Sequence, residues 1–171
     1  MGDWLFACMI PGDPIGKGRP RGTAAGGHVR LYTPKKTADW ERAAAMVMSS
    51  FWRKAPIDAA VEVEIMAMAS RPKRLLRKKD PNGLIWKPNK PDSDNIEKCT
   101  WDALVMAGVV RDDAQVVLNT TWSCYAPRDS GPKVCIRLRI VGKEPDGGWW
   151  DNVPRVPAVE PAFELDDELP W

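Results

Sequence analysis

Four aspartates form two close pairs in the second half of the chain. Asp92 and Asp94 are two residues apart, and Asp112 and Asp113 are adjacent. The segment between the pairs, residues 94–107, is predicted to be one helix, and a short turn after it would bring the second pair back toward the first. Clustered carboxylates repel each other unless a cation joins them, and their hard oxygens suit a divalent metal ion. We therefore expect a metal site of the kind that hydrolyses a phosphodiester.

Two further charged residues share one face of this predicted helix with Asp94. Lys98 and Asp102 follow it at intervals of four residues, which places the three side chains on the same side. Lys98 there can stabilise the charge of the transition state as an ammonium group, or take a proton through water as the neutral amine. Asp92 and Asp94 alone would also be explained as residues that cap the helix. The second acidic pair and the nearby cations argue against that simpler interpretation.

Positive charge surrounds these acidic residues in the sequence. Residues 143–171 contain two basic and eight acidic residues. The totals of 25 basic and 23 acidic residues therefore leave 23 and 15 in residues 1–142, a net charge of +8 for the body and −6 for the tail. A basic body indicates a polyanionic partner such as DNA.

Two loops supply the candidate DNA contacts. They span residues 12–22 and 71–91, and the cations in them that we expect to bind phosphates are Lys17, Arg19, Arg21, Arg74, Arg77, Lys78, Lys79 and Lys90. Solvated loops without a binding role have a similar composition, so this alternative stays open. Trp86 in the second loop would either stack on an unpaired base or pack against the protein.

Other kinds of site find little support in the sequence. His28, the one histidine, stands in a Gly-rich stretch where we expect it to be exposed rather than catalytic. The loop at 12–22 lacks the spacing of a nucleotide-binding P-loop. No apolar run is long enough to span a membrane, and we expect an intracellular protein with free thiols. The cysteines form no C-x-x-C pair, which argues against a zinc site or a disulfide framework: Cys8, Cys99, Cys124 and Cys135.

Hydrophobic periodicity and the positions of Pro and Gly predict the elements that hold these residues. We expect one helix at 36–54, with an apolar stripe, and a second at 94–107 that ends before Gly108. Strands are expected at 3–10, 29–32, 60–69, 114–125 and 133–141. This order predicts a single α+β domain over residues 1–142, with a mixed or antiparallel sheet and two main helices. The Pro-rich residues 143–171 are predicted to be a disordered tail.

These motifs resemble those of the RusA family of Holliday-junction resolvases, which are found in phages and prophages. The resemblance rests on the D-x-D-N-x-x-K element from Asp92 to Lys98, the D-A-L of 102–104 and the D-D-x-Q-V of 112–116. The stretches Lys17-Gly-Arg-Pro-Arg21 and Tyr32-Thr-Pro34 also resemble the phage branch of that family. The resemblance covers about residues 4–141 and leaves out the tail.

The resemblance implies a homodimeric endodeoxyribonuclease that depends on Mg²⁺, with Mn²⁺ as a substitute. Such an enzyme nicks four-way DNA junctions symmetrically, here in the cytoplasm of a bacterial host. The catalytic and metal-binding aspartates of the family fall on Asp92, Asp94 and Asp113, and its important lysine falls on Lys98. Asp102 and Asp112 match motif positions as well, and we expect them to support the site rather than to do chemistry.

Two alternatives remain at this point. A protein that binds branched DNA without cutting it would share the basic loops, although it gains nothing from carboxylates near the phosphates. The chain end, residues 163–171, resembles the acidic tip of bacterial single-stranded-DNA-binding proteins. It would then bind host repair or replication proteins, fold back on the basic loops, or serve only as a solubilising tail.

Overall fold

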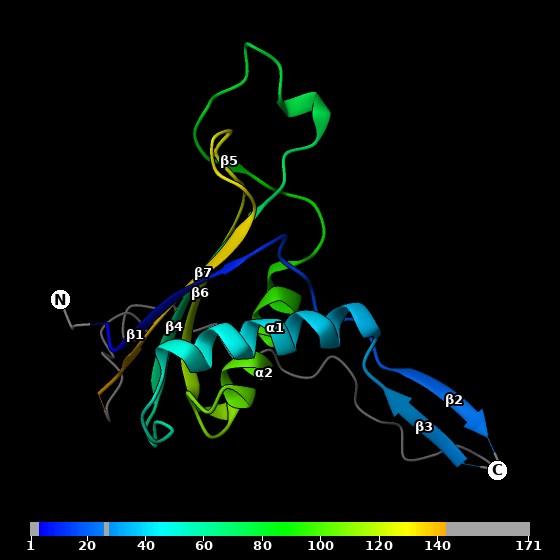
Figure 1. The fold of residues 1–171 in the computed structure, drawn as a ribbon, viewed down its shortest axis with the longest axis vertical. Helices are drawn as coiled ribbons and strands as arrows, with labels where there is room; N and C mark the ends of the chain where they lie inside the picture. Colours follow the sequence, from blue (N-terminus) through cyan, green and yellow to red (C-terminus); the bar gives the residue numbers. More distant parts are fainter. Residues whose placement is uncertain (1–3, 26–27, 143–171) are drawn as a thin grey trace, which may run out of the picture. The chain divides into compact units, whose positions relative to one another are not determined.

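The computed structural model describes residues 4–25 and 28–142 of the 171 residues. It contains a five-stranded sheet with the strand order β1-β7-β4-β6-β5 and a separate hairpin of β2 and β3 (Figure 1). Only the β4–β6 pair is parallel within the large sheet. The strands are β1 (Phe6–Pro11), β2 (Arg21–Ala25), β3 (His28–Tyr32), β4 (Val61–Ala69), β5 (Ile85–Trp86), β6 (Val116–Tyr125) and β7 (Lys133–Ile140).

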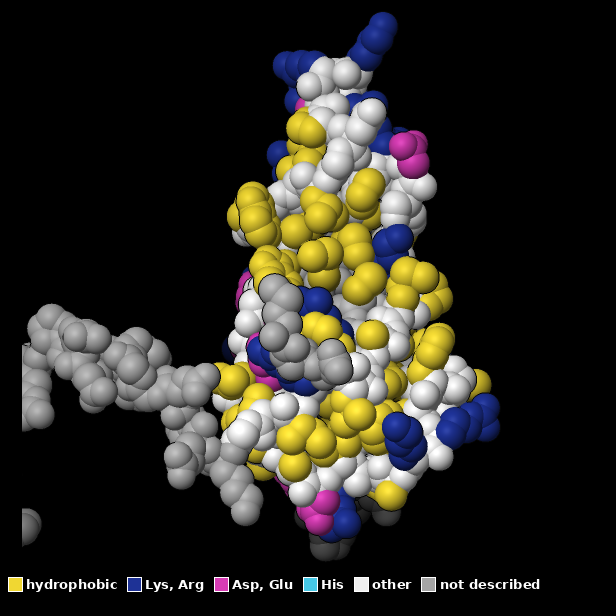
Figure 2. Space-filling model, turned by 90° about the vertical axis from the view of Figure 1, so that its left-hand side faces the viewer, with side chains coloured by type: hydrophobic (Ala, Val, Ile, Leu, Met, Phe, Trp, Pro, Cys, Tyr) yellow, Lys and Arg dark blue, Asp and Glu magenta, His cyan; other side chains and the backbone are white. Residues whose placement is uncertain are grey.

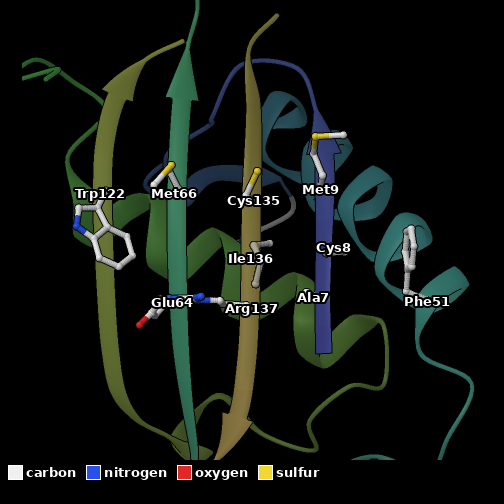
Figure 3. A pocket seen from close by; sticks show the side chains of 10 residues that line it. All are labelled: Ala7, Cys8, Met9, Phe51, Glu64, Met66, Trp122, Cys135, Ile136 and Arg137. Atoms are coloured by element: carbon white, nitrogen blue, oxygen red, sulfur yellow. Dashed lines mark hydrogen bonds and ion pairs between the residues drawn. The ribbon is translucent and has the colours of Figure 1, made fainter. Parts of the chain in front are cut away.

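Two main helices, α1 (Lys35–Phe51) and α2 (Ser93–Met106), pack against each other and against one face of this sheet. Figure 3 shows them behind the strands. Two short 3₁₀ helices are η1 (Lys73–Leu75) and η2 (Asp113–Gln115). The prediction of a single α+β domain with a mixed sheet and two main helices is therefore confirmed. No helix within the described residues is long and apolar enough to cross a membrane.

The core lies between the helices and β4. The alternation predicted for this strand is confirmed, because its four inward residues are all fully buried: Val61, Val63, Ile65 and Ala67. On α2, Ile96, Cys99 and Ala103 are fully buried as well. Gly108 follows the helix with φ at +69°, a left-handed conformation that favours glycine and ends α2 where the sequence predicts.

The structure departs from the sequence pattern at three places, the last apolar residues of α1 and β7 and the end of the N-terminal loop. Phe51 is 64% exposed and Ile140 is 52% exposed, although both continue an apolar pattern. Each is the last residue of its element, where the neighbouring layer no longer covers it. The loop expected through residue 22 already includes the start of β2, which pairs with β3 from Arg21 onward. The predicted tail, residues 143–171, lies outside the described residues.

The loop at residues 12–20 is packed against the starts of both helices. The N–H of Lys17 donates to the carbonyl of Asn95 at 2.8 Å, and the N–H of Gly18 donates to the hydroxyl of Thr37 at 3.2 Å. Gly16 lies so close to the next loop that an added Cβ would be 2.7 Å from the Cβ of Pro91. Only glycine fits there without moving the residues that lead into α2.

Residues 71–86 form a basic arm that follows β4 and ends with the short strand β5, drawn in green at the top of Figure 1. The guanidinium of Arg71 donates to the carbonyl of Ala126 at 2.7 Å and to four carbonyls of the arm, those of Leu75, Pro81, Asn82 and Gly83. Arg128 donates to two more arm carbonyls, those of Arg77 and Asp80. These hydrogen bonds give the arm one defined conformation, which an unstructured solvated loop would lack.

Candidate active site

Asp92 and Asp94 stand at the N-terminus of α2. Asp92 occupies the capping position, with extended backbone at φ −71° and ψ 150°, but its carboxylate makes no capping hydrogen bond. Asp94 follows in the first turn, where a negative charge is favoured by the helix dipole. Its carboxylate accepts from the ammonium of Lys98 at 3.1 Å. Both aspartates are exposed, so their oxygens are accessible to a ligand.

Lys87 anchors the segment that leads into Asp92. This lysine is buried, and its ammonium donates to the carbonyls of Asn89 and Lys90. Its backbone N–H donates to the carbonyl of Ser123 on β6 at 3.0 Å. The conformation of the residues just before the acidic pair is therefore fixed to the sheet. Sequence reasoning missed this role, because Lys87 looks like any other member of a basic run.

Asp112 and Asp113 lie at the opposite end of α2. The carboxylate of Asp112 accepts from the N–H of Ala114 at 2.8 Å. The side chain of Gln115 accepts from the N–H of Asp112 at 3.0 Å and donates to the carbonyls of Ile57 and Ala59, both at 2.9 Å. This network fixes the turn beside the start of β4 and leaves Asp113 exposed.

The helix keeps the two acidic pairs apart within one chain. After α2 the chain turns to Ile57, whose N–H donates to the carbonyl of Val109 at 2.9 Å, instead of running back along the helix. A helix of 14 residues is about 20 Å long, whereas carboxylate oxygens bind a metal ion at about 2.0–2.6 Å. Among the described residues, no group of three or more His, Cys, Asp or Glu is placed to hold a metal. The expectation that the pairs meet within one chain is therefore wrong.

Lys17 links the N-terminal loop to both helices. Its ammonium donates to Glu41 on α1 at 2.7 Å and to Asp102 on α2. Burial alone would lower the pKa of Lys17, but the hydrogen bonds to Asp102 and Glu41 outweigh that effect and raise it. Asp102 thus has a structural partner, and Glu41 is a buried charge that the apolar periodicity of α1 did not reveal. A phosphate contact by Lys17 stays a prediction.

A cleft of about 410 Å³ lies beside Asp92. Lys17 and Lys90 contribute cations to it, and Gly16, Pro91 and Asn95 complete its lining. A larger cavity of about 660 Å³ lies on the face of the sheet away from the helices, and its lining is mostly apolar (Figure 3). In the larger cavity the carboxylate of Glu64 is already paired with Arg137. The first cleft instead places the exposed carboxylate of Asp92 beside two lysines, and it is therefore the candidate for phosphate chemistry.

The predicted DNA contacts are mostly exposed. Lys90 is exposed in the lining of the cleft and Arg19 is exposed in the N-terminal loop, while the side chain of Arg21 lies outside the described residues. Arg77 lies 3.7 Å from Asp80. Figure 2 shows Lys and Arg side chains gathered at the top of the view, where Figure 1 places the basic arm. The exposed cations of this arm include Lys73, Arg74, Lys78 and Lys79.

Exposed carboxylates beside lysines in an open cleft, next to an ordered basic arm, are the features expected of a nuclease. The chain belongs to the RusA endodeoxyribonuclease family, because the family model described as Endodeoxyribonuclease RusA matches residues 11–139. It is also 32% identical over 137 residues to the uncharacterized protein YqaN of Bacillus subtilis (strain 168), a match that covers 77% of this chain and 94% of that protein. RusA enzymes are endonucleases that resolve Holliday junctions, so the family assignment from the sequence is confirmed.

The ion pairs of Lys17 predict a loss of stability when this side chain is replaced. Lys17→Met leaves Glu41 buried and unpaired, which costs about 3 kcal/mol in the free energy of unfolding. A second change, Glu41→Gln, should recover much of the loss, and Lys36→Met at an exposed position of α1 is the control. Urea unfolding followed by circular dichroism measures all three. An equal effect of both lysine changes would contradict the assigned role.

The ion pairs of Lys17 also determine how the stability of the fold depends on pH. Because the pKa of Lys17 is raised in the folded state above its ordinary value of 10.5, its stabilisation is complete below that pH. It is lost as the pH rises through the folded-state pKa. Lys17→Met should therefore remove one alkaline component of the stability profile and leave the neutral range flat.

Proposed function

We propose that this chain is a Mg²⁺-dependent endodeoxyribonuclease that resolves four-way junctions by paired nicks, each at an acidic site completed by a second copy of the chain. Within the RusA family, the observation that supports this best is the exposed pair of Asp92 and Asp94 beside a lysine-lined cleft. In this proposal, each site combines Asp92 and Asp94 of one copy with Asp113 of the other copy.

The donor set fits a hard divalent ion. An aspartate at a helix cap ordinarily accepts a hydrogen bond from the first turn, yet Asp92 does not, so its oxygens remain available for another partner. Asp92, Asp94 and Asp113 would hold the metal ion, and Mn²⁺ would substitute for Mg²⁺. Such an ion, when bound, supplies an activated water and neutralises charge on the phosphate.

The chain's own cations have separate tasks. Lys98 holds the carboxylate of Asp94 in place and, being exposed, can reach a phosphate oxygen to stabilise the transition state or relay a proton through water. The exposed cations of the basic arm, together with Arg19 and Lys90, bind the phosphates of the junction arms. The affinity that these phosphate contacts contribute depends on salt concentration and not on base sequence.

The edge of β6 supports a dimer that completes the site. β5 pairs only with residues 124–125 of β6, and the N–H of Lys87 donates a hydrogen bond to the carbonyl of Ser123. In the described structure no strand pairs with the outer side of residues 116–122, and Val117 and Leu118 there are 55% and 53% exposed. An unpaired apolar edge of this kind is a template for another strand.

We infer that two such edges pair antiparallel around a two-fold axis that passes beside Asn119. Residue 116 of one copy lies opposite residue 122 of the other, so Asp113 of the second copy arrives at the segment from Lys87 to Asp92 of the first. Each chain then completes the acidic site of its partner. Two equivalent sites related by a two-fold axis match a four-way junction, which is itself two-fold symmetric.

A junction-binding protein that does not cut is the second candidate. The separation of Asp113 from Asp92 and Asp94 within one chain favours it, since a monomer would have an incomplete acidic site. Its basic arm would still bind branched DNA, and residues 163–171 would recruit repair or replication proteins. The two candidates differ in one measurable respect, which is the breakage of phosphodiester bonds.

Cleavage of a synthetic four-way junction tests the proposed reaction. With Mg²⁺ or Mn²⁺, the wild-type protein should make symmetric nicks in two opposite strands. Asp113→Asn should lower the rate by more than about 100-fold, because the third metal ligand is lost, while junction affinity in Ca²⁺ stays within a few-fold of wild type. Denaturing gels and fluorescence anisotropy give the two readouts. Tight binding without nicks in either metal would support the non-cutting candidate.

A charge at the β6 edge tests the dimer. Leu118→Lys places two ammonium groups near the proposed two-fold axis, so the variant should be monomeric at concentrations where wild type is dimeric. The monomeric variant should also lose cleavage, since neither acidic site is complete in a monomer. Met46→Lys, at an exposed apolar position of α1, is the matched control and should leave both unchanged. Light scattering after size exclusion measures the mass; a dimeric, active Leu118→Lys protein would contradict the interface.

A further inference from the structure

Trp86 is the most exposed aromatic side chain among the described residues of the body, at 70%. It pairs with Cys124 across the β5–β6 ladder, and that neighbour is buried while the indole is not. The sequence left open whether this tryptophan packs against the protein, and its exposure excludes that role. We propose that Trp86 stacks on a DNA base that is unpaired at the branch point of the junction, a role that rests on the proposed function for its substrate.

The position of Trp86 is fixed before any ligand binds. The residue after it, Lys87, is bound to Ser123 through its backbone and to two carbonyls through its ammonium. On the other side, Arg71 holds the carbonyls of residues 81–83 against β6 through Ala126. Because the backbone around Trp86 is held in place, only the side-chain rotamer of the indole has to be ordered on stacking, so more of the stacking free energy appears as affinity.

The positive charge of the same arm favours a nucleic acid as the partner of Trp86. Exposed cations within residues 73–79 precede the indole on the arm, and the exposed Lys90 follows it. The one acidic residue of the arm, Asp80, accepts from the N–H of Arg77 and lies near that guanidinium. Cations with an exposed aromatic are the combination that binds unpaired nucleic acid, in which phosphates meet the cations and bases stack on the ring. An acidic DNA strand fits this surface, whereas an apolar protein partner would leave the cations unmatched.

The distance to the acidic pair fits the same substrate. Asp92 is six positions after Trp86, and an extended chain spans at most about 3.6 Å per residue, so the two lie within about 22 Å. That is about six nucleotides along a strand at 3.4 Å each. A base held by Trp86 therefore lies within a few nucleotides of the phosphate at Asp92, which would place the cut close to the branch point.

Binding in Ca²⁺, where cutting is suppressed, tests the stacking directly. Fluorescence anisotropy would compare three labelled DNAs: a fully paired four-way junction, a junction with two unpaired thymines at its centre, and a linear duplex. Trp86→Ala should weaken binding to the junction with unpaired thymines by about tenfold, the typical loss of one base stack, and leave duplex affinity unchanged. The loss on the fully paired junction should be smaller, because a base there must first leave its pair. Trp86→Phe should keep most of the junction affinity. Leu84→Ala, an exposed apolar residue of the same arm, is the control and should change neither.

Crosslinking identifies the contact. A 5-iodouracil base at the branch point should crosslink to Trp86 on irradiation, and the same base placed ten pairs into an arm should not. Equal losses on junction and duplex, or no loss for Trp86→Ala, would overturn the proposal and leave the indole for a protein partner or a second copy. These readouts do not depend on cleavage, so wild-type protein that binds branched DNA but never nicks it would refute the proposed function and still report on Trp86.

Discussion

Carboxylates share a metal ion only when their oxygens come within about 2.0–2.6 Å of it, and α2 forbids this for the acidic residues of one chain. The helix is a rigid spacer of about 20 Å with Asp92 and Asp94 at one end and Asp113 beyond the other. The same helix carries Asp102, which ties it to the N-terminal loop through Lys17. In the proposed function, a second copy therefore completes the acidic site, and the unpaired edge of β6 offers the place for it.

Polar anchors, rather than the apolar core, position the candidate site. Lys87 holds the approach to Asp92, Gln115 holds the turn at Asp113, and Arg71 holds the basic arm, each by hydrogen bonds to backbone carbonyls. Donors that are buried, as in Lys87, or half-buried, as in Gln115 and Arg71, are costly when left unpaired, so each anchor favours one conformation of its loop over others. The acidic residues themselves stay exposed. Rigid supports with exposed functional groups suit a surface that must accept a bulky, branched, polyanionic ligand.

Much of the fold follows from local patterns. The alternation at Val61, Val63 and Ile65 marks a strand, and Gly108 marks the end of α2, because both signals depend on residues close in sequence. The motif around Asp92 and Asp113 likewise points to the family. The partners of Lys17 and Lys87 could not be predicted, since a buried lysine and a solvated one look alike in a basic run. Nor could the separation of the acidic pairs, which depends on where the chain turns after the helix.

Mixing two inactive variants tests most directly whether each acidic site spans two subunits. Asp94→Asn and Asp113→Asn chains would be unfolded together, refolded and assayed on a four-way junction with Mg²⁺. Sites shared between subunits predict recovery of about a quarter of the wild-type sites, because half of the dimers are mixed and each has one intact site. Those dimers would nick one strand of each junction. If every site lay within a single chain, no dimer in the mixture would have an intact site, and the absence of nicks would contradict the account.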